Sequence, residues 1–126
     1  MALNATDDSI HKAFSRNDAA GVMLYHHAGV IKALSFQRYL VGRDAVQADL
    51  KSTLESYHLE FIENKVENSY FQGKTAVRSY LFTIRGTPKQ GGEPFIFKGR
   101  SIVTYVRYSK SPTGWASIRE VVQPVP

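Results

Sequence analysis

The residues best suited to acid–base chemistry are a carboxylate and a pair of histidines. Glu120 lies in a strand-like run, and a carboxylate among apolar side chains accepts a proton more readily than one in water. His26 and His27 are adjacent, and histidine titrates near neutral pH. We therefore take Glu120 and His27 as candidate catalytic residues. Two alternatives stay open: Glu120 forms a salt bridge to an arginine of a neighbouring strand, or the histidines only stabilise the end of a helix.

Arginines and tyrosines within strand-like runs are candidates for ligand binding. Arg78 and Tyr80 are two residues apart, so they share one face of a strand, and Arg100 lies in the next run. If these faces line a pocket, their guanidinium and phenol donors would suit a carboxylate, an enolate or a phenolate. Tyr39 could stack on a planar ligand. The alternative is that these faces lie outside, in solvent or at a dimer interface.

The composition excludes several functional classes. The chain has no cysteine, and its four histidines lack the spacing of a metal motif such as HExxH, so we expect neither a metal site nor a cofactor. The net charge is +5, but the basic residues are spread along the chain, and we expect no nucleic-acid partner. The N-terminus lacks the pattern of a signal peptide, and no apolar run is long enough to cross a membrane. We therefore expect a cytoplasmic protein without a membrane partner.

Residues 1–58 predict helices interrupted by a short β segment. Thr6 is suited to cap a first helix, and Asn17-Asp18 separates it from a second that ends near His26-His27, with Gly29 as its stop. The segment 30–40 is short, apolar and aromatic, which favours a hairpin. Gly42-Arg43-Asp44 then opens a third helix that should end near Tyr57.

From residue 59 onward the hydrophobic period shifts toward two, which predicts strands over 59–71, 75–85, 94–108 and 115–122. Short turn-forming segments separate them, so neighbouring strands should be antiparallel. Long antiparallel strands twist and curl. We expect one α+β domain over residues 1–126, in which three N-terminal helices pack on a curled, mostly antiparallel sheet. This arrangement makes a cone with a pocket at its wide end.

Four segments resemble the nuclear-transport-factor-2-like superfamily, which has this cone-shaped, cystatin-like fold and includes SnoaL-like cyclases and ketosteroid isomerases. They are AFSRNDAAGVMLY (13–25), LVGRDAVQADL (40–50), GRSIVTYVR (99–107) and GWASIREVV (114–122). The resemblance implies a homodimer that buries the outer face of the sheet. It also implies that the catalytic tyrosine and carboxylate of ketosteroid isomerases correspond to positions near Ile10 and Lys32. Neither residue can play that role, so we do not expect this type of isomerisation.

Three functional hypotheses follow for a fold that hosts both enzymes and non-enzymes. The first is a SnoaL-like protein that binds a small apolar or anionic molecule, as an isomerase, cyclase or dehydratase acting by proton transfer on an apolar, oxygenated ligand. The second is a non-catalytic ligand-binding or assembly module of the same fold. The third, and weakest, is a binder of nucleic acid or acidic partners through the net positive charge.

Overall fold

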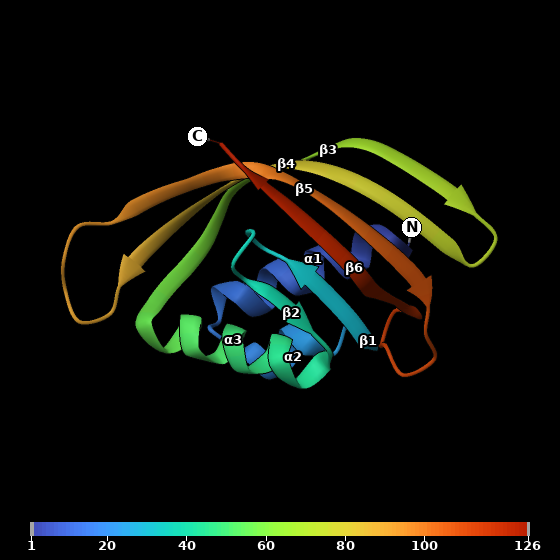
Figure 1. The fold of residues 1–126 in the computed structure, drawn as a ribbon, viewed down its shortest axis with the longest axis horizontal. Helices are drawn as coiled ribbons and strands as arrows, with labels where there is room; N and C mark the ends of the chain where they lie inside the picture. The colour runs from blue at the N-terminus through green and yellow to red at the C-terminus, as the bar shows by residue number, and fades with distance from the viewer. Residues whose placement is uncertain (1, 126) are drawn as a thin grey trace.

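A six-stranded sheet arches over the helices in the computed structural model, which describes residues 2–125 (Figure 1). The elements in chain order are α1 (Ala2–Ser15), α2 (Ala19–Met23), β1 (His26–Ala33), β2 (Tyr39–Val41), α3 (Arg43–Ser56), β3 (Tyr57–Gln72), β4 (Thr75–Pro88), β5 (Phe95–Arg107) and β6 (Trp115–Pro124). The four long strands from β3 to β6 confirm the predicted runs. β3, β4 and β6 extend past the predicted ends by one to three residues, and β5 is shorter by one residue at each end.

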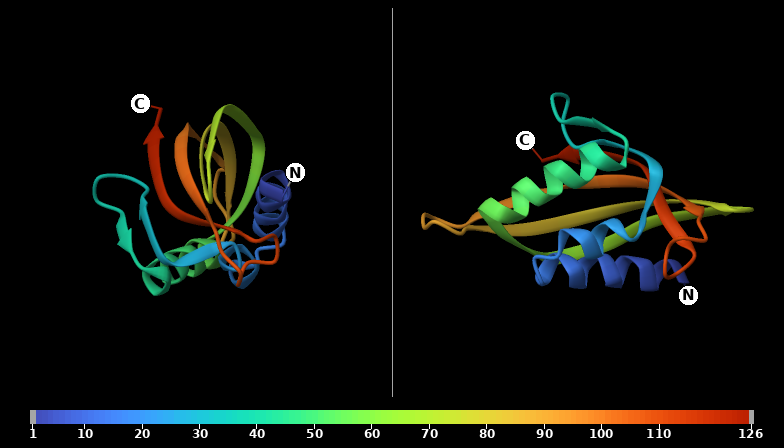
Figure 2. Two further views of the ribbon diagram at one scale, coloured as in Figure 1. Left: turned by 90° about the vertical axis from the view of Figure 1, so that its right-hand side faces the viewer. Right: turned by 90° about the horizontal axis from the view of Figure 1, so that it is seen from below.

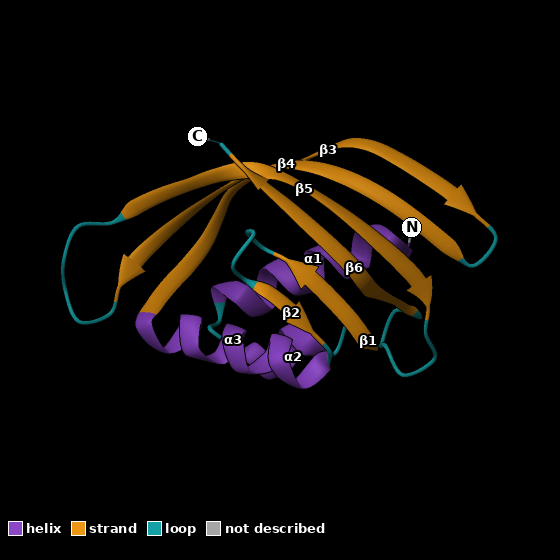
Figure 3. Ribbon diagram, in the orientation of Figure 1, coloured by secondary structure: helices purple, strands orange, loops and turns teal. Residues whose placement is uncertain are grey.

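The strand order in the sheet is β2-β1-β6-β5-β4-β3. β1 pairs in parallel with β6, and the other neighbouring pairs are antiparallel (Figure 3). Register shifts interrupt β3 opposite β4 and β6 opposite β5. Such bulges bend a strand and increase its twist. The sheet therefore curls, as expected from its long strands, and it is mostly antiparallel.

The helices lie on the concave side of this curl (Figure 2). α1 packs along β3 and against α2, while α3 packs on β1 and β3. Val46 and Leu54 of α3 are buried, and Leu50 between them packs on the cluster of Met23 and Val30. The stripe of apolar residues four apart in α3 thus faces the core. α2 has only five residues, and β1 and β2 separate it from α3.

Two local predictions are wrong. Thr6 does not cap α1, which already begins at Ala2; it is a buried residue inside the helix, where its hydroxyl donates to the Ala2 carbonyl. His26, His27 and Gly29 do not end α2, because they open β1. The short helix instead starts where predicted, since the Asp18 carboxylate accepts a hydrogen bond from the Gly21 N–H.

None of the helices formed by residues 2–125 combines the length and the hydropathy that crossing a bilayer requires.

Candidate functional site

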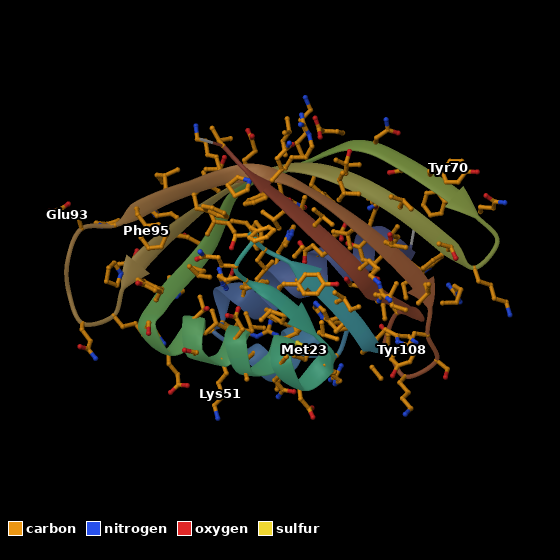
Figure 4. All side chains as sticks on the ribbon, viewed as in Figure 1. Met23, Lys51, Tyr70, Glu93, Phe95 and Tyr108 are labelled. Atoms are coloured by element: carbon orange, nitrogen blue, oxygen red, sulfur yellow. The ribbon has the colours of Figure 1, made fainter. Side chains whose placement is uncertain are left out.

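A cavity of about 560 Å³ lies between the concave face of the sheet and the helices. Its walls are mostly apolar and rich in aromatic rings, which come from α1 and from β3, β4 and β5: Phe14, Phe61, Phe82, Phe95 and Phe97. Phe95 lies at the end of β5 next to the loop that carries Glu93 (Figure 4), and its ring meets Tyr57 edge-on at 5.3 Å. A cavity of this size and lining can hold a small, largely apolar molecule.

An ion pair interrupts this apolar wall. Lys32 of β1 and Glu120 of β6 are register partners in the sheet, and Lys32 Nζ lies 2.9 Å from Glu120 Oε1. Both side chains line the cavity, with 15% and 18% of their surface exposed. The pair places a carboxylate beside a cation in a partly desolvated site, where electrostatic interactions are stronger than in water.

A second polar group joins α1 to the middle of the sheet. Asp7 accepts hydrogen bonds from the hydroxyls of Tyr80, at 2.8 Å, and of Tyr105, also at 2.8 Å, and the two hydroxyl oxygens are 2.8 Å apart. Arg78 Nη1 lies 2.9 Å from Asp7 Oδ2. Arg78 is 5% exposed, so its charge is compensated inside the protein rather than by water.

The two phenols of this group stay protonated at neutral pH. Burial raises the pKa of Tyr80 and of Tyr105, and the negative charge of Asp7 adds to the rise for both. Two hydroxyl protons therefore serve four oxygen–oxygen contacts among Asp7, Tyr80 and Tyr105, so two of these contacts have no proton of their own.

His26 provides a neutral imidazole at the cavity wall. Its side chain is buried, and Nδ1 lies 3.0 Å from the Val22 carbonyl oxygen. A carbonyl only accepts, so Nδ1 carries the proton. Burial, followed by the nearby charge of Lys32, lowers the pKa of His26 well below its ordinary value. The other ring nitrogen, Nε2, is therefore an acceptor in the neutral ring.

One further carboxylate lines the cavity, from α3. Asp49 lines the cavity, and its Oδ2 accepts a hydrogen bond from Arg38 Nη2 at 2.6 Å. Across residues 2–125, no group of three or more His, Asp or Glu side chains is arranged to hold a metal ion.

The structure brings some of the sequence-predicted residues to the cavity. Glu120 and Tyr80 line it, and Arg78 lies on the same strand face as Tyr80 and binds Asp7 rather than entering the cavity wall. The predicted alternation is correct for this face. The salt bridge foreseen for Glu120 also exists, but its partner is Lys32 and not an arginine.

Three other candidates lie away from the cavity. His27 points to the opposite side of β1 from His26, with its ring 4.6 Å from that of Tyr108 and its Nδ1 accepting from the Gly29 N–H. Tyr39 is on the edge strand β2 and is 60% exposed. Arg100 projects from the convex face and pairs with Glu67 at 2.8 Å. Alternation along β1 and β5 explains the positions of His27 and Arg100, because neighbouring residues of a strand face opposite sides.

Asp7, His26 and Lys32 are cavity residues that the sequence did not reveal as candidates. Asp7 lies in the second turn of α1, on the helix face that packs toward the sheet, where its carboxylate meets Tyr80 and Tyr105. The sequence singled out the pair His26-His27 but placed it in a helix. The two residues belong to a strand instead, and in that strand His26 faces the cavity and His27 does not.

Comparisons with known proteins find similarity in structure but not in sequence. No model of a known protein family matches the chain, and no curated protein matches it in sequence. Among solved structures, a candidate scytalone dehydratase from Novosphingobium aromaticivorans has a TM-score of 0.87 at 12% identity, covering 99% of this chain and 83% of that chain.

Two further structures carry family names. A candidate dehydratase of the NTF2-like family from Streptomyces avermitilis has a TM-score of 0.82 at 15% identity, covering 98% of this chain and 93% of that chain. A ketosteroid isomerase-like protein from Erwinia carotovora atroseptica has a TM-score of 0.80 at 14% identity, covering 99% of this chain and 95% of that chain. At these identities the likeness shows a shared fold, which is that of the nuclear-transport-factor-2-like superfamily.

Proposed function

We propose that this chain, which has the nuclear-transport-factor-2-like fold, binds a small, largely apolar, oxygenated molecule in its cavity and moves a proton on it. The reaction class is an isomerisation, a cyclisation or a dehydration, in which Glu120 takes a proton from a carbon next to a carbonyl group. The names of the similar structures, which include dehydratases and an isomerase-like protein, agree with this class.

The Glu120–Lys32 pair carries the proposal. A carboxylate that removes a proton from carbon leaves negative charge on the carbonyl oxygen, and that charge needs a cation or a hydrogen-bond donor nearby. The ammonium of Lys32 lies 2.9 Å from Glu120, on the same wall of the cavity. One pair can therefore supply both the base and the positive charge that stabilises the enolate.

The apolar lining supports an apolar ligand skeleton. Aromatic and aliphatic side chains surround the ion pair, and transfer of an apolar molecule from water to such a site is favourable. The phenols of Tyr80 and Tyr105 offer a second place for a ligand oxygen.

Binding is tested with 2-naphthol, a planar phenol of suitable size, by the change in its fluorescence. Val122 lines the cavity, whereas Val121 precedes it on β6 and is 54% exposed on the other face. Val122→Phe should weaken binding by about tenfold or more, because the added ring occupies cavity volume. Val121→Phe adds the same ring outside and should leave the affinity unchanged. Equal affinities for both variants would contradict binding in the cavity.

Proton transfer is tested with 2-tetralone, an apolar ketone, by NMR of hydrogen–deuterium exchange at its α-carbon. The protein should accelerate exchange above the buffer rate, and Glu120→Gln should abolish most of that acceleration, by about 100-fold or more. Asp49→Asn is the matched control, since Asp49 is also a cavity carboxylate but pairs with Arg38. Binding without exchange would refute the enzyme proposal and favour a non-catalytic binding module.

We also propose a homodimer that buries the convex face of the sheet. Ile96, Ile102 and Val121 leave about half of their surface exposed on this face. Ion pairs lie among them, including Arg100 with Glu67. A mixed apolar and charged surface of this kind is suited to association with a second copy.

A further inference from the structure

Ser117 has an unpaired hydroxyl at the cavity wall. The residue is 3% exposed, and its Oγ is buried without a hydrogen-bond partner among residues 2–125. Its backbone N–H is satisfied by the Tyr25 carbonyl at 2.9 Å, so only the side chain is left over. A buried hydroxyl without a partner costs free energy, and such groups in native proteins usually receive a hydrogen bond from water or a ligand.

His26 lies beside Ser117 on the neighbouring strand. The two residues are register partners in the parallel pairing of β1 with β6, and both line the cavity. Because Nδ1 of His26 donates to the Val22 carbonyl, its Nε2 is left as an acceptor. Neighbouring strands are about 4.8 Å apart, so a single oxygen atom placed between the two side chains can reach both.

We infer that His26 and Ser117 form a subsite for a hydroxyl group of the ligand. This inference rests on the proposed function and narrows its substrate class to alcohols and phenols. A ligand hydroxyl donates its proton to His26 Nε2 and accepts one from Ser117 Oγ, so that both side chains are satisfied at once.

The donor and acceptor pattern excludes other oxygen groups from this subsite. A ketone or an ether oxygen has no proton for Nε2, and it would leave the lone pair of His26 facing its own lone pairs. A carboxylate fits no better, because the neutral imidazole gives it no donor at Nε2. The Lys32–Glu120 pair lies farther along the same two strands, β1 and β6. It is available for the carbonyl group of the same ligand.

Two shape-matched probes test the subsite: 2-naphthol, which carries a hydroxyl, and 2-methylnaphthalene, which has a methyl group in its place. The measured quantity is the ratio of their dissociation constants, taken for each protein variant. Ser117→Ala should shift this ratio against 2-naphthol by about three- to tenfold, which corresponds to one hydrogen bond. His26→Asn should do the same, because asparagine keeps an N–H near Val22 and loses the Nε2 acceptor.

Ser101→Ala is the matched control. Ser101 is a buried serine on the cavity wall, but it lies on β5 opposite Val122 rather than beside His26. It should leave the ratio unchanged. A wild-type protein that binds neither probe would refute the proposed function itself. If the protein binds both probes and neither Ser117→Ala nor His26→Asn changes the ratio, the subsite alone is refuted. The same result is expected if only water occupies the subsite.

Discussion

Lys32 and Glu120 join two strands of the sheet through their side chains, with Lys32 Nζ 2.9 Å from Glu120 Oε1 on the wall of the cavity. By resemblance to ketosteroid isomerases, the position near Lys32 corresponds to a carboxylate. In this chain a lysine holds that position, and its neighbour in the sheet register, Glu120, supplies the carboxylate. The cavity therefore holds a carboxylate beside Lys32, and the proposed function assigns it the role of the base.

The first prediction concerns the strength of this pair. In a double-mutant cycle of Lys32→Met and Glu120→Gln, the coupling in the free energy of unfolding should be about 1–3 kcal/mol, because both side chains are largely withdrawn from water. The pair of Arg85 and Glu60 is the control, since its side chains are 48% and 39% exposed. Its coupling should be about 0–1 kcal/mol. Urea unfolding measures both, and equal couplings would show that the cavity pair is as well solvated as the surface pair.

The second prediction concerns the group that ties α1 to the sheet. Asp7→Asn leaves the buried guanidinium of Arg78 without its counter-charge, and it should lower the free energy of unfolding by about 3 kcal/mol or more. Tyr105→Phe removes one hydroxyl and should cost about 1–2 kcal/mol. Urea unfolding at neutral pH measures both values. A loss for Asp7→Asn no larger than that for Tyr105→Phe would contradict a structural role of the Asp7–Arg78 ion pair.

Local patterns predict most of the fold because they depend on neighbouring residues. The period of two marks β3 to β6, and Gly42, with a backbone φ of 91°, marks the start of α3. The same patterns fail at Thr6 and His26. Thr6 is a good capping residue, but α1 extends past it to Ala2; His26 follows a helix whose end no glycine or proline marks.

The candidate site depends on contacts that local patterns do not contain. Asp7 meets Tyr80 and Tyr105 from a different element, and Lys32 meets Glu120 through strand pairing. Arg78 lies on the concave side of the sheet and Arg100 on the convex side. The sequence does not determine these sides, because a register shift of one residue in a strand would turn each of its side chains to the opposite face. The sequence therefore identifies candidates, and the curl of the sheet selects among them.

The third prediction concerns the convex face of the sheet. If a second copy covers it, Ile102→Lys and Val121→Lys should each shift the protein from dimer to monomer, because they bury a charge in an apolar contact. Lys51→Glu is the control, since Lys51 points into solvent from α3 on the other side of the molecule (Figure 4). Sedimentation velocity measures the state. A monomeric wild-type protein, or lysine variants that remain dimeric, would refute this interface.

The last prediction concerns the pH dependence of stability. Burial, with the charge of Lys32 as the next cause, holds the pKa of His26 in the folded protein well below its ordinary value of 6.5. Below pH 6.5 the unfolded chain therefore binds a proton that the folded protein refuses, so stability is lost as the pH falls, by at most about 1.4 kcal/mol per pH unit for this one group.

The pH prediction is tested by comparing urea unfolding at about pH 7.5 and about pH 5.5, on either side of the ordinary histidine pKa. The wild-type protein should lose more free energy of unfolding over this interval than His26→Asn, which has no imidazole to protonate at that position. Burial also lowers the pKa of His11, to a lesser extent, so His11→Asn should remove a smaller part of the loss. If the wild type and His26→Asn lose the same amount, the pKa of His26 is not lowered by folding, which would contradict a buried imidazole that resists protonation.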